Sequence, residues 1–242
     1  MTKILLIDTA TEFCSAAIAV DGAVVALAES AESLRHAPLL TPQIDRCVRE
    51  SGISLADLDA VAVSRGPGSY TSLRVGVSVA KGICYALGKP LIAVDTLLSL
   101  ALASDDQQSL SGTPFYFLPM LDARRNEVWT CIYDNAFQPL NDPQPLILEN
   151  NSFVDYLTAN IPDAEKAGFV VSGNGMEKLS NVIFFENTVL GSIKKSSAAY
   201  LCTPAFQAFQ MSDFQDVAYF EPLYMKPPNI TVSNKSLWHQ KQ

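Results

Sequence analysis

The stretch KILLIDTATEFCSAAIAVDGAVVALA, residues 3–28, decides the fold. Residues 3–9, 15–20 and 23–28 are apolar runs of strand length within it. The pair Asp21-Gly22 between the last two runs is a strong signal for a type I′ hairpin turn. Three antiparallel strands are therefore predicted at the start of the chain.

Helices and strands alternate after these three strands. The pattern predicts a helix that ends at Gly52, a strand at 60–64, a long helix between Gly68 and Gly88, a strand at 91–94 and a helix at 96–103. Three antiparallel strands followed by helix, strand, helix, strand and helix are the order of the ribonuclease H-like module. The first part of the chain is therefore predicted to be an α/β module of this kind.

A looser copy of the same order follows the polar residues 107–113. Its expected elements are strands at 115–121, 127–133, 146–149 and 169–172, a helix at 153–159 and a glycine turn, Gly173-Asn174-Gly175, after the last strand. Two ribonuclease H-like modules in tandem make the actin-like (ASKHA) architecture, here with a degenerate second module. We expect an N-terminal module at 1–106, a C-terminal module at 107–228 and a polar tail at 229–242.

The composition excludes several classes of protein. With 17 Lys and Arg against 25 Asp and Glu, the formal charge is −8, which argues against binding nucleic acid by this chain alone. Charged residues are only 17%, which is typical of a surface partly covered by another protein. Five cysteines without a C-x-x-C pair indicate a reduced, cytoplasmic chain. No run reaches 18 uncharged apolar residues, so neither a signal peptide nor a membrane span is expected.

The sequence lacks the residue patterns that most metal-dependent and acyl-transfer enzymes require. The two histidines, His36 and His239, are separated by nearly the whole chain, and neither H-E-x-x-H nor G-x-S-x-G occurs. The pair Gly88-Lys89 is followed by Pro90 and lacks the upstream glycine of a phosphate-binding P-loop. We therefore predict no metal site and no catalytic residue, and we interpret His36 as a helix-start or interface residue.

The residues after the first strand are weak candidates for a nucleotide site. Residues 8–11, Asp-Thr-Ala-Thr, lie where actin-like nucleotide enzymes place an aspartate for Mg²⁺ and hydroxyl residues for phosphate. Close approach of backbone amides to phosphate favours glycine there, and this chain has Ala10. The glycine turn at 173–175 could also hold a phosphate. Asp8, Thr9, Thr11, Gly173 and Gly175 are therefore weak candidates, and purely structural turns are the alternative interpretation.

The most specific motif is GPGSYTSLRVG, residues 66–76. Pro67 fixes one torsion angle, Gly66 and Gly68 permit a turn that other residues avoid, and Ser69 or Thr71 can cap the helix that follows. Here the chain closely resembles the TsaB (YeaZ) family of bacterial tRNA threonylcarbamoyladenosine biosynthesis proteins, whose hallmark reads GPGSFTGLRIG. The signature residues present are Gly66, Pro67, Gly68, Ser69, Thr71 and Arg74, whereas Ser72 replaces a glycine of the family.

Four other segments extend the resemblance over nearly the whole chain. Residues 6–11 look like the family opening, and residues 36–42 look like its histidine-to-proline helix start. Residues 122–129, DARRNEVW, are similar to the family's DARRGEVY, and residues 222–226, PLYMK, resemble its closing P-x-Y-x-R. Asn126 replaces a glycine, and Lys226 replaces the final arginine.

The resemblance implies a non-catalytic role. TsaD, the family's catalytic paralogue, carries a histidine pair that holds a metal, and the equivalent positions here are Thr96 and Leu100, which cannot serve as such ligands. The resemblance implies a scaffold or activator subunit that supports TsaD, with the ATPase TsaE, in transferring threonylcarbamoyl to the adenosine beside the anticodon. It implies tRNA binding only through the complex and no cofactor beyond weak nucleotide at a subunit interface. The alternatives are a self-sufficient actin-like kinase or ATPase and, less favoured, a metallopeptidase.

A partner surface is expected on the helix that follows Gly68. Small residues recur there in two rows, Ser72/Gly76/Ala80 and Ser78/Gly82/Ala86, and such rows let a second helix approach closely. The resemblance implies that the N-terminal helix pair binds TsaD, and forms homodimers when the chain is alone. The expected interface residues are His36, Leu39, Leu40, Gln43, Ser72, Val75, Gly76 and Val79, with Leu73 adding apolar contact. Gly76→Arg is then expected to leave the monomer folded and to abolish both complexes, unless both rows pack internally.

Overall fold

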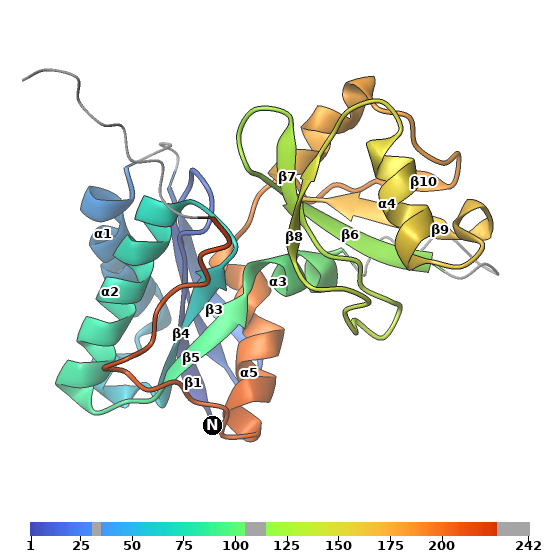
Figure 1. Ribbon diagram of the computed structural model, residues 1–242. Helices are drawn as coiled ribbons and strands as arrows, with labels where there is room; N and C mark the ends of the chain where they lie inside the picture. Colours follow the sequence, from blue (N-terminus) through green and yellow to red (C-terminus); the bar gives the residue numbers. More distant parts are fainter. Residues whose placement is uncertain (31–34, 105–114, 227–242) are drawn as a thin grey trace, which may run out of the picture.

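The first sheet is ordered β3-β2-β1-β4-β5 in the computed structural model, which describes residues 1–30, 35–104 and 115–226 (Figure 1). Its strands are β1 (Lys3–Asp8), β2 (Ser15–Val20), β3 (Ala23–Glu29), β4 (Ala60–Gly66) and β5 (Leu91–Asp95). β1 pairs antiparallel with β2 and parallel with β4, which places it at the centre of the sheet. A central strand is buried on both faces, which explains why residues 4–7 are all apolar.

Two helices cover one face of this sheet. They are α1 (His36–Ser51) and α2 (Tyr70–Leu87), and a short 3-10 helix, η1 (Leu55–Asp57), precedes β4. Both long helices end on a glycine in the left-handed conformation, Gly52 and Gly88, as the sequence predicts. The shared core includes Leu5 and Ile7 of β1 and Leu40 of α1. The helix α3 (Thr96–Ala103) turns away from this face and contacts the second sheet.

The second sheet repeats the order of the first, as β10-β9-β6-β7-β8. Its strands are β6 (Phe115–Asp122), β7 (Glu127–Thr130), β8 (Gln144–Ile147), β9 (Gly168–Ser172) and β10 (Thr188–Leu190). β6 is the central strand, antiparallel to β7 and parallel to β9, as β1 is in the first sheet. The helix α4 (Ser152–Asn160) and the one-turn η3 (Ala164–Lys166) precede β9. The eight-residue 3-10 helix η4 (Asn174–Asn181) occupies the place that α2 has in the first sheet.

The C-terminal helix differs from the expected division of the chain. The short η5 (Ala198–Leu201) and α5 (Cys202–Gln210) pack on the free face of the first sheet (Figure 1). That face is apolar, with Ile4, Leu6 and Ala62, and it would meet water without this cover. The expectation that residues 107–228 form one module is therefore wrong for this helix. The expected boundary at 106–107 and the tail at 229–242 lie outside the described residues.

All five cysteines are free and buried, and the described helices are not of a kind that could cross a bilayer. Burial raises the pKa of Cys47, Cys84 and Cys131 to about 11, so these thiols stay protonated at pH 8. Because the thiolate is the reactive form, we expect no cysteine of the folded chain to react with a thiol reagent at pH 8. All five should react in denaturant; labelling of the native chain, followed by mass spectrometry, would contradict this expectation.

Candidate functional site

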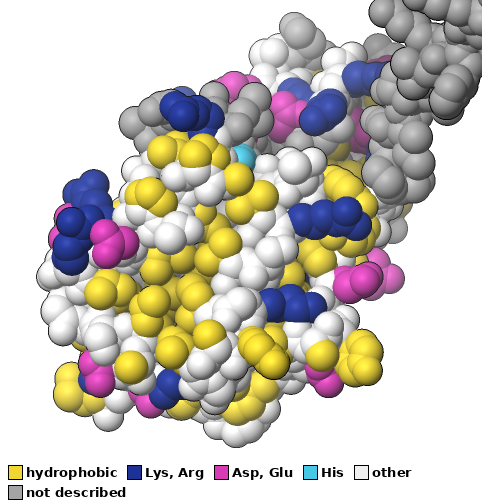
Figure 2. Space-filling model, turned by 90° about the vertical axis from the view of Figure 1, so that its left-hand side faces the viewer, with side chains coloured by type: hydrophobic (Ala, Val, Ile, Leu, Met, Phe, Trp, Pro, Cys, Tyr) yellow, Lys and Arg dark blue, Asp and Glu magenta, His cyan; other side chains and the backbone are white. Residues whose placement is uncertain are grey.

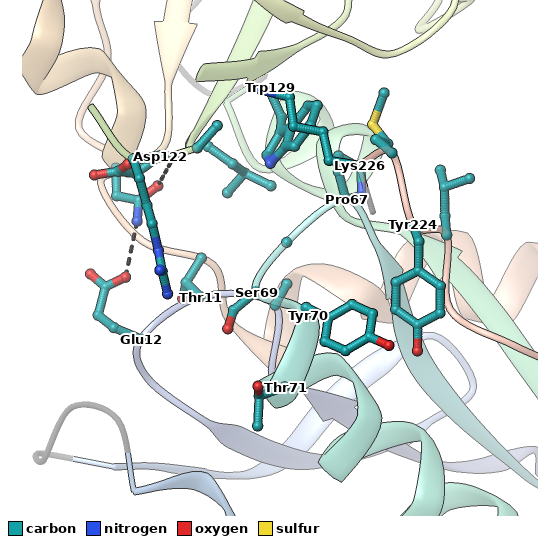
Figure 3. Close-up of a pocket in the computed structure, with 18 of the residues that line it drawn as sticks. Thr11, Glu12, Pro67, Ser69, Tyr70, Thr71, Asp122, Trp129, Tyr224 and Lys226 are labelled. Atoms are coloured by element: carbon teal, nitrogen blue, oxygen red, sulfur yellow. Dashed lines mark hydrogen bonds between the residues drawn. The ribbon is translucent and has the colours of Figure 1, made fainter. Parts of the chain in front are cut away.

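A cavity of about 600 Å³ lies between the two sheets, where the motif segments meet (Figure 3). It is lined by residues 10–12 after β1, residues 67–71 at the start of α2, residues 121–124 at the end of β6, and residues 223–226, with Trp129, Asn174 and Glu177. β1 is parallel to β4, and β6 is parallel to β9, so each pair of strands ends at one edge of its sheet. The two edges face each other, which is a common place for a site in α/β proteins.

The loop after β1 brings only one of its three candidate residues to the cavity. Asp8 is 1% exposed, and its Oδ1 accepts a hydrogen bond from the Ala10 amide at 3.0 Å. Thr9 is fully buried and faces α2. Thr11 lines the cavity, and its hydroxyl lies 3.0 Å from the hydroxyl of Ser196. The Asp8 carboxylate therefore stabilises the loop from within.

The glycine turns pack against the ends of neighbouring strands. A Cβ on Gly68 would lie 2.4 Å from the Ala10 carbonyl oxygen, and the Ser69 amide donates to that oxygen at 2.8 Å. A Cβ on Gly173 would lie 2.2 Å from the Met120 carbonyl oxygen, and one on Gly175 would lie 3.0 Å from the Met120 Cβ. Neither Gly173 nor Gly175 lines the cavity. These contacts agree with the structural interpretation of the 173–175 turn.

The start of α2 differs from the expected cap. Ser69 is the N-cap residue, but its side chain makes no hydrogen bond to the backbone of the helix. The hydroxyl of Ser72 instead donates to the hydroxyl of Ser69 at 2.9 Å. Ser72 is buried, so the serine that replaces the family's glycine fits inside the fold and is bonded to the neighbouring turn. Thr71 lines the cavity and is exposed.

Residues 213–226, the C-terminal strap, return over α2 to the cavity (Figure 1). The ring of Tyr224 lies 4.6 Å from the ring of Tyr70, measured between centroids. Arg74 donates from Nε to the Tyr224 hydroxyl at 3.0 Å, and its guanidinium lies 4.3 Å from the Tyr70 ring centroid. That hydrogen bond raises the pKa of Arg74 above its ordinary value. The signature arginine therefore joins the 66–76 motif to the closing 222–226 motif.

Polar side chains bridge the cavity on its other side. Asn174 donates from Nδ2 to Glu12 Oε2 at 3.0 Å, and its Oδ1 accepts from the Asp122 amide at 2.9 Å. Lys178 pairs with Asp122 at 2.6 Å. The sequence did not single out Glu12, Asn174 or Lys178 for this role, because each is an ordinary polar residue whose partner lies far away in the chain. The available signal in the sequence was that these residues lie close to recognised motifs.

The expected partner surface is only partly exposed. His36, Leu40, Ser72 and Gly76 are buried, as is Leu73, so the expectation that they line an open surface is wrong. His36 lies inward, with Nε2 2.8 Å from the Thr11 carbonyl oxygen. The remaining expected residues, Leu39, Gln43, Val75 and Val79, are half-buried along the junction of α1 and α2. The second small row, Ser78, Gly82 and Ala86, is the exposed one.

Metal-binding side chains do not gather within residues 1–30, 35–104 and 115–226, where no three His, Cys, Asp or Glu residues are placed to hold an ion. Thr96 and Leu100 are both fully buried. Asp95 caps α3 by accepting from the amides of Leu97 and Leu98 at 2.9 and 3.0 Å, and it pairs with Arg65 at 3.4 Å. Burial nevertheless raises the pKa of Asp95, against these favourable contacts.

Solved structures with this fold are known. The chain matches YeaZ from Pseudomonas aeruginosa with a TM-score of 0.76 and 25% identity, over 93% of this chain and 100% of that one. It also matches inorganic polyphosphate/ATP-glucomannokinase from Arthrobacter sp. strain KM with a TM-score of 0.52, over 87% of this chain and 100% of that one. At 10% identity, the kinase shows only the shared fold.

Sequence comparison agrees with the fold. The chain is 37% identical over 131 residues to the tRNA threonylcarbamoyladenosine biosynthesis protein TsaB of Escherichia coli (strain K12), which is 54% of each chain. It is 34% identical over 126 residues to the TsaB of Haemophilus influenzae, covering 52% of this chain and 51% of that protein. The chain thus matches about half the length of these relatives. A family model described as TsaD: tRNA N6-adenosine threonylcarbamoyltransferase matches residues 29–220. The chain therefore belongs to the TsaD family and, within it, to the TsaB (YeaZ) members.

Proposed function

We propose that this chain supports the synthesis of threonylcarbamoyladenosine in tRNA as a non-catalytic scaffold or activator of a TsaD-like catalytic subunit. A TsaE-like ATPase would complete the assembly, and the chain would act in the cytoplasm and form a homodimer when alone. The TsaB relatives, named for this biosynthesis, support the pathway. The acidic balance of the chain, −8, agrees with tRNA being held by other subunits.

The observation that carries the scaffold role is the exposed face of the α1–α2 pair. Ser78, Gly82 and Ala86 are exposed on α2, and Tyr85 beside them is 87% exposed. Figure 2 shows apolar side chains gathered over this face of the molecule, with lysine and arginine side chains at its margin. Small side chains would let a partner helix lie at the short end of the usual separation of about 8–10 Å. Such a face suits a helical partner.

The cavity supports the non-catalytic part of the proposal. Asp8, the candidate for a Mg²⁺-binding aspartate, is turned into its own loop, and the glycine turns are filled by strand ends. The second module is proposed to be a degenerate copy, because the 3-10 helix η4 occupies the place of α2. A short 3-10 helix offers fewer aligned amides to a phosphate than a long α-helix does.

The test is reconstitution with the TsaD-like protein of the same organism. The chain should co-purify with that protein, and tRNA modification in the complete system should fall when the chain is omitted. No complex and no difference in modification would overturn the proposal. Calorimetry on the chain alone should give a Kd for ATP no tighter than roughly millimolar, about −4 kcal/mol. A micromolar Kd would favour the kinase or ATPase alternative.

Gly82→Arg is the variant that tests the face directly. A Cβ on Gly82 meets no atom within 4 Å, and arginine favours the helix over glycine by up to about 1 kcal/mol, so the monomer should stay folded. In a docked complex the long cation would be buried without a partner, at a cost of about 3 kcal/mol or more, which weakens binding about 100-fold. We expect loss of both the homodimer and the TsaD-like complex in light scattering.

The matched control is Ala159→Arg, which adds the same charge to an exposed position on α4, away from this face. It should leave both complexes intact. A folded Gly82→Arg chain that still dimerises and still captures the TsaD-like protein would mean that the partner lies elsewhere.

A further inference from the structure

The C-terminal strap is fixed to the first module along most of its length. Lys81 of α2 donates from Nζ to the carbonyl oxygens of Ala218 and Phe220, both at 3.0 Å. Further on, the Leu223 amide donates to the Arg65 carbonyl oxygen at 2.7 Å. These contacts join the strap to α2 and to the end of β4, so the strap moves with the first sheet.

The end of the strap contacts the second module. Lys226 forms an ion pair and hydrogen bond with Oε2 of Glu127, the first residue of β7, and its Nζ lies 5.2 Å from the Trp129 ring centroid. Met225 packs against the apolar cluster that contains Leu121 and Trp129. Between the two anchors, Arg74 and Tyr70 hold Tyr224 at the rim of the cavity. The strap therefore spans the cavity from one module to the other.

The opposite rim has its own bridge. There Glu12 of the first module accepts a hydrogen bond from the side-chain nitrogen of Asn174. The side-chain oxygen of Asn174 accepts a hydrogen bond from the backbone amide of Asp122. Figure 3 shows Glu12 and Asp122 on one side of the cavity and Tyr224 and Lys226 on the other. Two polar bridges thus flank the cavity.

The contact beneath the cavity is of a different kind. Leu97, Leu100 and Ala101 of α3 are buried with Phe117 and Leu121 of β6. A buried apolar contact resists separation, whereas a partly exposed ion pair contributes only about 0–1 kcal/mol. The Lys226 and Glu127 side chains are 45% and 18% exposed. Opening would therefore start at the rim and turn about the α3–β6 contact.

We propose that the C-terminal strap is a releasable clasp that holds the second module against the first and sets the width of the cavity. Lys226 closes the clasp, and Arg74 is a positioning residue that places Tyr224 so that Lys226 reaches Glu127. The strap also passes beside Gly82 and Tyr85, which share a groove with residues 216–218. A link between the clasp and a docked partner would rest on the proposed function; the clasp itself does not.

The test uses Trp129 as a reporter. The chain has two tryptophans, Trp129 and Trp238, so a Trp238→Phe background leaves Trp129 alone. In that background, Lys226→Met and Arg74→Gln should each raise the acrylamide quenching constant of Trp129 about two-fold, because release of the clasp exposes the ring. Hydrogen exchange at the Leu223 amide should accelerate in Arg74→Gln. The melting temperature, set by the buried cores, should change little.

Two further variants test whether the changes come from release of the clasp. Lys166→Met removes a lysine that pairs with Asp163 at an exposed position, and it should leave Trp129 quenching unchanged. The double variant Lys226→Met, Asn174→Ala removes the polar bridge at each rim of the cavity. It should increase the radius of gyration in small-angle X-ray scattering, with unchanged circular dichroism. Unaltered quenching in both single variants, or an unaltered radius in the double variant, would overturn the clasp.

Discussion

Gly173→Ala is expected to lower the free energy of unfolding by about 4 kcal/mol, from two separate faults. Gly173 has φ of +90° and ψ of 169°, a region essentially confined to glycine that costs a residue with a Cβ on the order of 1–3 kcal/mol. The added Cβ would also lie 2.2 Å from the Met120 carbonyl oxygen. That oxygen belongs to the backbone of β6, so relief requires a shift of the central strand, and overpacking of this kind costs about 1–3 kcal/mol.

Gly88→Ala is the control, because it also places a Cβ at a positive φ but adds no close contact. Gly88 has φ of +61°, and a Cβ there meets nothing within 4 Å. We expect a loss of about 1 kcal/mol for this variant. Urea unfolding followed by circular dichroism measures both variants in the same way. Equal losses for the two variants would mean that Gly173 does not pack tightly on β6.

Much of the fold follows from local patterns. The hairpin of β2 and β3 is predicted by Asp21-Gly22, and α2 is bounded by glycine signals at both ends. β10 was not predicted, because Thr188–Leu190 is only three residues long and lies in a stretch with little periodicity. Neither α5 nor its position on the first sheet was predicted. Its amphipathic pattern says that one face is buried, but it does not say which of two apolar sheets covers that face.

The candidate site, like the fold, could be predicted from the sequence only in part. Three segments that contribute to the cavity, residues 66–71, 122–129 and 222–226, could be selected from the sequence, the first from its glycines and proline and the other two from the family resemblance. The bridging residues Glu12 and Asn174 could not, because their bond joins positions 162 residues apart. Short-range spacing carries no information about such a pair. The three motif segments could therefore be selected and the bridge could not, because only the segments are continuous in the sequence.

The two rows of small residues on α2 illustrate a subtler failure. Both rows have the same four-residue spacing, and helical periodicity alone does not tell which row faces the sheet. The choice is made by Thr9, the residue directly after β1, which fills the space under Gly76. The inward row is therefore Ser72, Gly76 and Ala80, and the expected behaviour of Gly76→Arg is reversed. This variant should fail to fold.

Gly76→Ala makes this contact measurable. The new Cβ would lie 2.3 Å from the Oγ1 of Thr9 and 3.1 Å from its Cγ2. Overpacking should cost about 3 kcal/mol, of which the better helix propensity of alanine returns about 1 kcal/mol. The net loss is expected to be about 2 kcal/mol in urea unfolding. No loss would mean that α2 lies farther from β1 than the structure places it.

Thr9→Ala should rescue that loss. The Oγ1 of Thr9 is buried without a hydrogen-bond partner, so its removal should change stability by no more than about 1 kcal/mol. In the double variant the contact that residue 9 makes with the new methyl group is through its Cβ, at 3.3 Å. We expect a favourable coupling energy of about 2 kcal/mol between the two changes, as for residues in direct contact. Additive losses would show that Gly76→Ala acts through something other than Thr9.

Gly76→Arg extends the argument to the largest side chain. Removal of two side-chain atoms at Thr9 cannot accommodate a guanidinium between α2 and β1, where its charge would lie unpaired among apolar neighbours such as Val77 and Leu73. The variant should be unfolded in circular dichroism both alone and with Thr9→Ala, whereas Gly82→Arg, six residues along the same helix, should be folded. A folded Gly76→Arg chain would mean that the rows are reversed and that Ser72, Gly76 and Ala80 face outward after all.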